Sequence, residues 1–132
     1  MRQVVEGDSR GGFCSALTDA SSLRVFYHMG EWAIPRLEGS YLYAFVSLND
    51  ARQFIREVIF GIHAVILVCE AETVELTPYI YDLPWRVQEI VEWWKEKMLT
   101  THPYAWEHGS RLAPDGTVWC TKVRPTMEVL NV

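Results

Sequence analysis

The chain has 132 residues, of which 49% are hydrophobic and 22% are charged, and its formal net charge is -5. These values are typical of a soluble globular protein and fit a single domain spanning residues 1–132. The excess of acids disfavours nucleic-acid binding, and no apolar run approaches the roughly 20 residues that cross a membrane, so we expect a cytoplasmic protein with neither kind of partner.

Short strands are predicted in the first part of the chain. Residues 2–6 and 13–17 have strand-like composition and are separated by a glycine-rich turn. Residues 23–28 are rich in β-formers and end just before Gly30, which predicts another strand. The segment 31–40 contains Pro and Gly and is expected to be a surface loop whose Trp32 and Ile34 dock onto the core.

The central stretch, residues 41–70, predicts a strand, a helix and a second strand. Apolar residues lie on one face of the helix at i, i+3, i+4, i+7 and i+8, and Ser47 and Asp50 have the spacing of a capping box. Gly61 is expected to end the helix. The flanking runs, 42–46 and 64–69, are continuously apolar, which is typical of interior strands covered on both faces.

The last third of the chain predicts a longer helix and two strands. Residues 84–98 show a helical apolar stripe with Trp93 at its border, and residues 100–109 form a loop. Residues 117–123 alternate, with Lys122 on the face of Val118, which predicts a strand near the sheet edge. A further strand is expected after Pro125. The order predicts an α+β fold: a mixed, mainly antiparallel sheet of five or six strands, two helices packed on it, and one strand-helix-strand crossover.

Two blocks of sequence carry a resemblance. The turn Gly-Glu-Trp at 30–32 is followed by Phe-Val-Ser-Leu-Asn-Asp-Ala-Arg-Gln-Phe at 45–54, and a Gly-Thr pair at 116–117 opens the closing strand. In this pattern the chain resembles a loose set of short uncharacterised proteins from phages and bacterial mobile elements. The resemblance implies a shared fold and no known activity.

Few residues point to catalysis. His102, Glu107 and His108 share a loop but match no standard metal motif, so a solvated loop is the expectation and no metal or cofactor is predicted. His28 stands at a strand end close to Glu31, where it would be rigidly held and reachable by solvent. The three cysteines are too few and too far apart for a disulfide framework and suit reduced thiols. No catalytic residue is assigned.

The aromatic content is the strongest functional indication. Six Trp, six Tyr and five Phe exceed what a small sheet with two helices is expected to bury, so some rings should be exposed. The preferred hypothesis is a non-enzymatic binding module that presents an aromatic surface, with Trp32, Trp93 and Trp106 as candidates, to a protein partner or to a second copy in a homodimer. The alternative is a small-molecule pocket or enzyme with His28, Glu31 and Trp32 at a cleft mouth near the loop of His102 and Glu107. A dense aromatic core is the competing structural explanation for the same rings.

Overall fold

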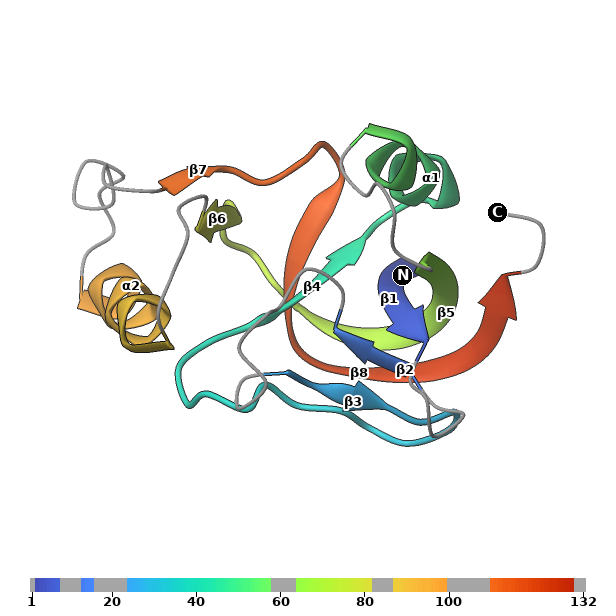
Figure 1. Cartoon of the computed structure of the whole chain (residues 1–132), viewed down its shortest axis with the longest axis horizontal. Helices are drawn as coiled ribbons and strands as arrows, with labels where there is room; N and C mark the ends of the chain where they lie inside the picture. The colour runs from blue at the N-terminus through green and yellow to red at the C-terminus, as the bar shows by residue number, and fades with distance from the viewer. Residues whose placement is uncertain are drawn as a thin grey trace.

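The computed structural model describes most of the chain and shows an α+β fold (Figure 1). The described residues are 2–7, 13–15, 24–57, 64–81, 87–99 and 110–129. The elements are β1 (Arg2–Gly7), β2 (Phe13–Ser15), β3 (Phe26–Tyr27), β4 (Leu42–Phe45), α1 (Leu48–Glu57), β5 (Ala64–Val74), β6 (Tyr79–Tyr81), α2 (Val87–Leu99), β7 (Ser110–Leu112) and β8 (Thr117–Val129). Gly61 and the predicted loop over residues 100–109 lie outside the described residues. Neither described helix is long and apolar enough to cross a membrane.

Six strands form one strongly curved sheet in the order β3-β2-β1-β4-β8-β5. Because β1 also pairs with β5, the pairings β1–β4, β4–β8, β8–β5 and β5–β1 close into a ring. Its interior is filled by buried side chains from every one of these four strands, including Val5, Ala44, Leu67 and Cys120. Strands β6 and β7 form a separate two-stranded ribbon.

The strand-helix-strand unit differs in one respect from a simple parallel crossover. Strands β4 and β5 run in the same direction, but β8 lies between them and pairs antiparallel with both. All pairings among the described strands are antiparallel, so no mixed sheet is seen there. Strand β4 is continuously apolar because it is covered on both faces, as predicted. Leu42 and Ala44 face the ring interior, whereas Tyr43 and Phe45 are covered by other packing from outside.

Strand β8 departs most from the prediction. It is one continuous strand in the middle of the sheet, and Pro125 lies within it beside a register shift, where its missing N–H is tolerated. A second shift makes Lys122 the partner of Glu72 and Cys120 the partner of Thr73, so Thr121 is an extra residue. The predicted alternation is therefore wrong beyond Cys120. After the bulge Val123 is buried, and Lys122 turns outward.

Helix α1 begins as the sequence predicts. The amide N–H of Asp50 donates a hydrogen bond to Ser47 Oγ at 3.1 Å, and that hydroxyl donates to Asp50 Oδ2 at 2.8 Å. The helix covers one end of the ring (Figure 1). Ala51 and Phe54 of the helix pack with Phe45 of β4.

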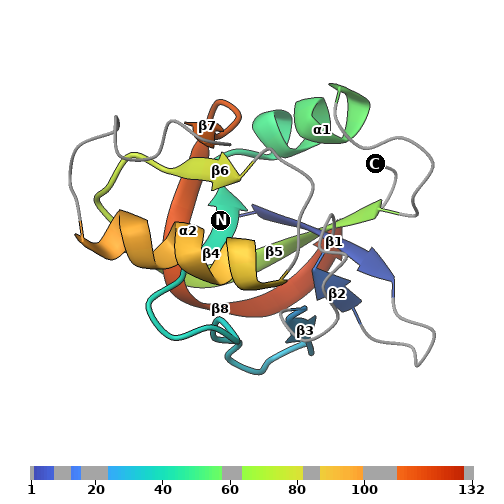
Figure 2. The same ribbon diagram turned by 60° about the vertical axis from the view of Figure 1, so that its left-hand side comes forward.

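Helix α2 packs against the outer face of β4 and β8 through an aromatic cluster (Figure 2). Trp94 lies 5.6 Å from Trp119 and 4.8 Å from Trp93 between ring centroids, and Tyr41 stacks on Trp119 at 5.3 Å. Tyr43 donates a hydrogen bond from its hydroxyl to the Tyr79 carbonyl at 2.6 Å. These rings account for much of the aromatic excess as core, as the competing explanation predicted.

Candidate functional site

A short segment after β3 extends the curved sheet alongside β8. The Ala33 N–H donates to the Val123 carbonyl at 2.7 Å, and the Val123 N–H donates back to the Ala33 carbonyl at 3.0 Å. Ala33 is buried, so its neighbours Trp32 and Ile34 point to the outer face. There they are 44% and 65% exposed. The prediction that these two side chains dock onto the core is wrong because the backbone, through Ala33, makes that contact.

Two cationic side chains of β8 contact the Trp32 ring. Lys122 Nζ lies 4.5 Å from the ring centroid, and Arg124 Cζ lies 5.1 Å from it. Both side chains flank Val123, the partner of Ala33, so the strand pairing places them next to Trp32. Cation–π contacts of this kind stabilise an exposed ring by about 0.5–1 kcal/mol each. Trp32 is therefore an ordered aromatic side chain on the surface.

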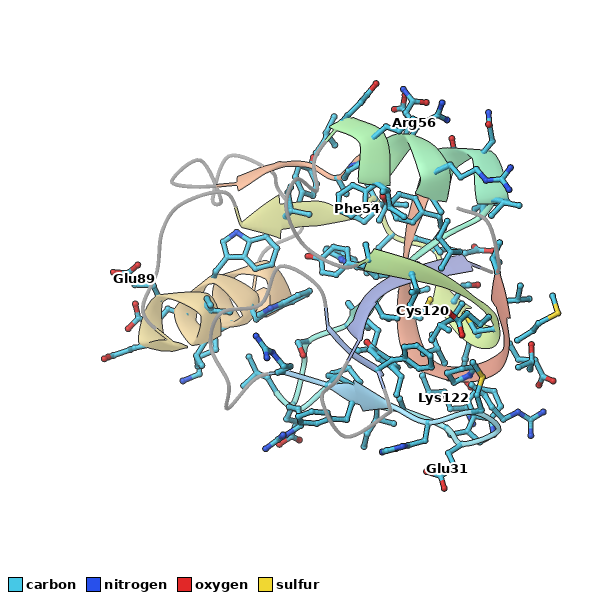
Figure 3. The ribbon with its side chains drawn as sticks, turned by 45° about the vertical axis from the view of Figure 1, so that its right-hand side comes forward. Glu31, Phe54, Arg56, Glu89, Cys120 and Lys122 are labelled. Atoms are coloured by element: carbon cyan, nitrogen blue, oxygen red, sulfur yellow. The ribbon has the colours of Figure 1, made fainter. Side chains whose placement is uncertain are left out.

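Two carboxylates of β5, the strand that pairs with the other edge of β8, lie on the same face. Glu70 Oε2 lies 2.6 Å from the Arg124 guanidinium, and Glu72 Oε2 lies 3.9 Å from Lys122 Nζ. The bridged segment 32–34, strand β8 and strand β5 thus present an apolar, a cationic and an acidic column. We define the Trp32 face by Trp32, Ile34, Lys122, Arg124, Glu70 and Glu72. In Figure 3, Lys122 and Glu31 lie at the same lower side of the molecule, whereas Cys120 lies inside.

The predicted cleft residues are only partly brought together. His28 and Glu31 are both exposed and belong to the turn before Trp32, in which the Glu31 N–H donates to the His28 carbonyl at 3.1 Å. No hydrogen bond or ion pair joins the side chains of His28 and Glu31, both of which are described. His102, Trp106 and Glu107 lie outside the described residues. Across the described part of the chain, no group of His, Cys, Asp and Glu is arranged to hold a metal ion.

Trp93 is a correction to the predicted aromatic surface. It is only 4% exposed and packs on Trp94 within α2. Both Trp93 and Trp94 are buried although they are adjacent on the helix, because aromatic side chains from β4 and β8 cover a wide arc of its surface. Trp93 therefore belongs to the core and is unavailable to a partner.

The buried titratable groups are poor nucleophiles. Burial, with the neighbouring Cys69, raises the pKa of the Cys120 thiol to about 11, so the reactive thiolate is scarce at neutral pH. Burial also raises the pKa of Tyr43, against a smaller opposing effect of a hydrogen bond with Trp119. Cys69 is buried as well, and the side chain of Cys14 lies outside the described residues.

The four charged residues of the Trp32 face were not predicted from sequence. Glu70 and Glu72 follow the apolar run of β5 with spacing i, i+2, and Lys122 and Arg124 have the same spacing in β8. This spacing places each pair on one face of a strand. The pairing of the two strands could not be read from it, because the register depends on the bulge at Thr121.

Comparison of the chain with known protein families, with curated proteins and with solved structures found no match.

Proposed function

We propose that the protein is a binding module that engages a protein partner through the Trp32 face. The observation that supports this function is the exposure of Trp32 beside Ile34 on a rigid sheet. Tryptophan, with arginine, dominates the binding energy of protein interfaces because a large ring buries much area at low entropic cost. Here Lys122 and Arg124 already order the ring, which lowers that cost further.

The surroundings of Trp32 suit an interface. The Gly30 N–H donates to the Pro125 carbonyl at 2.7 Å, two residues along β8 from the pairing of Ala33 with Val123. This pairing brings the exposed Met29 and Met127 near the end of the Trp32 face that lies next to the turn. Methionine and tryptophan are enriched in protein interfaces, where a polar rim surrounds the apolar centre. The alternative of a small-molecule pocket or enzyme has no comparable support, because His28 and Glu31 point to solvent from a turn.

The experiment first locates the contact with the partner protein by crosslinking and then measures the binding affinity. A photo-crosslinking amino acid is introduced at Ile34 and, as a matched control, at Leu112, which is 62% exposed in β7 and belongs to the other sheet. We expect a specific crosslinked protein from position 34 only. With that protein purified, Trp32→Ala should weaken binding about 30-fold, as a hot-spot loss of about 2 kcal/mol requires.

Leu112→Ala should leave the affinity unchanged within about twofold, since surface truncation outside an interface removes no contact. Equal crosslinking from both positions, or an unaltered affinity of Trp32→Ala, contradicts the proposal.

A further inference from the structure

The charges of the Trp32 face are not equally available to a partner. The side chains of Arg124 and Lys122 are 35% and 41% exposed, and each already contacts both the Trp32 ring and a carboxylate. The side chains of Glu70 and Glu72 are 54% and 61% exposed. A carboxylate has about four acceptor sites. Glu70 accepts from Arg124 through Oε2, whereas Glu72 accepts from the Thr121 hydroxyl through Oε1 and faces Lys122 through Oε2. These contacts leave about three acceptor sites on Glu70 and about two on Glu72.

The Trp32 face is formally neutral, because Glu70 and Glu72 balance Lys122 and Arg124, whereas the whole chain carries -5. A partner with an excess of bases is therefore attracted at a distance as well as at contact.

Two symmetric arrangements of a second copy on this face bring like charges together. If two Trp32 faces met with their strands in register about a two-fold axis through the cationic column, Lys122 and Arg124 of one copy would lie over the same pair of the other. Rotation about an axis across the strands also sets each column on its own kind. Like charges facing each other are destabilising. A different protein with bases over Glu70 and Glu72 avoids the repulsion present in both of these arrangements.

We infer that the partner binds through a segment that combines apolar and basic side chains. The apolar side chain packs on Trp32 and Ile34, and Arg or Lys reaches Glu70 and Glu72. Neighbouring strands are about 4.8 Å apart, so the two anchoring points, which are two strands apart, are separated by about 10 Å. This inference rests on the proposed function and adds the chemical class of the partner.

Two synthetic peptides of equal length test the class of partner. One alternates Leu with Arg, and the other alternates Leu with Glu. Binding is followed by the indole N–H signal of Trp32 in ¹⁵N-labelled protein, assigned by its loss in Trp32→Phe. We expect the Leu/Arg peptide to bind about tenfold more tightly, since its cations pair with Glu70 and Glu72 whereas the acids of the Leu/Glu peptide are repelled by them.

Charge variants provide the matched control. Glu70→Gln with Glu72→Gln should weaken the Leu/Arg peptide about fivefold and flatten its salt dependence. Glu89→Gln with Glu92→Gln changes the net charge equally on the exposed face of α2 and should leave binding within about twofold. Circular dichroism confirms that each variant is folded.

The outcomes separate the two proposals. If both peptides bind equally and Trp32→Ala abolishes both, the basic partner is ruled out and the binding face remains. The basic partner is also ruled out if neither peptide shifts the Trp32 signal, and the face is then judged by crosslinking at position 34. Concentration-dependent dimerisation that Trp32→Ala abolishes, measured by sedimentation, would overturn the inference in favour of a second copy.

Discussion

Two glycines with nearly the same backbone conformation are under different steric constraint. Gly30 and Gly116 have φ of 78° and 79°, values in the left-handed region that L side chains rarely adopt. A Cβ at Gly30 would meet open space. A Cβ at Gly116 would collide with the Asp50 carboxylate, which the Ser47 hydroxyl holds at the start of α1. The turn before β8 and the first turn of α1 are therefore packed against each other through this glycine.

This difference predicts the effect of matched substitutions. Gly30→Ala should lower the free energy of unfolding by about 1 kcal/mol, the cost of a left-handed Ala. Gly116→Ala should cost about 1–2 kcal/mol more, because Asp50 must also move and lose its bond to Ser47. Urea unfolding of both variants measures the difference. Equal losses would show that the Asp50 contact is unimportant.

The buried thiol of Cys120 makes the free energy of unfolding decrease at alkaline pH. Its pKa is raised in the folded protein to about 11, against about 9 for the unfolded chain. Between these values the folded protein keeps a proton that the unfolded chain has released, so stability is fully present below pH 9 and falls as the pH rises toward 11. The slope is up to about 1.4 kcal/mol per pH unit.

Cys120→Ala provides the control for this slope. The variant is less stable at neutral pH because it leaves a cavity, but its stability should fall less steeply across the same interval. The raised pKa of Tyr43 adds a similar loss at higher pH in both proteins, so the difference between them isolates the thiol. Urea titrations at successive pH values measure it, and parallel slopes would contradict the assignment.

At the scale of elements, the two helices cover the sheet by different means. Helix α1 has a local start signal and a narrow apolar face directed at Phe45. Helix α2 depends on adjacent tryptophans, Trp93 and Trp94, that pack with rings from β4 and β8. Adjacent positions on a helix are about 100° apart, so burial of both requires neighbours that surround a wide arc. The cluster supplies them.

Because this wide arc of α2 is buried, we predict that Trp93 contributes to the stability of the fold and not to binding. Trp93→Ala should lower the free energy of unfolding by about 3–5 kcal/mol, as large buried aromatic side chains do. Trp32→Ala should cost at most about 2 kcal/mol, since it removes two exposed cation–π contacts. Thermal and urea unfolding compare them. A small loss for Trp93→Ala, or unfolding of Trp32→Ala, would reverse their assignment to core and surface.

At the scale of the whole molecule, closure of the sheet produces the Trp32 face. Strand β8 lies between β4 and β5 and also pairs with Ala33, so segments from three distant parts of the chain meet on its outer side. The bulge at Thr121 then turns Lys122 outward. Without that extra residue, the predicted alternation would direct Lys122 to the same side as Cys120, which is the ring interior.

The sequence by itself determined the α+β class, the presence of both helices, the capped start of α1 and the buried strands of the central unit. These features follow from local periodicity and from hydrogen bonds within a few residues, which neighbouring side chains encode directly. Only the tertiary structure decided that Trp93 is buried, that Trp32 is exposed, and that Trp32 meets Arg124 and Glu70. Those outcomes depend on strand order and on a bulge, which are fixed by pairing between distant segments and leave no periodic trace in either strand alone.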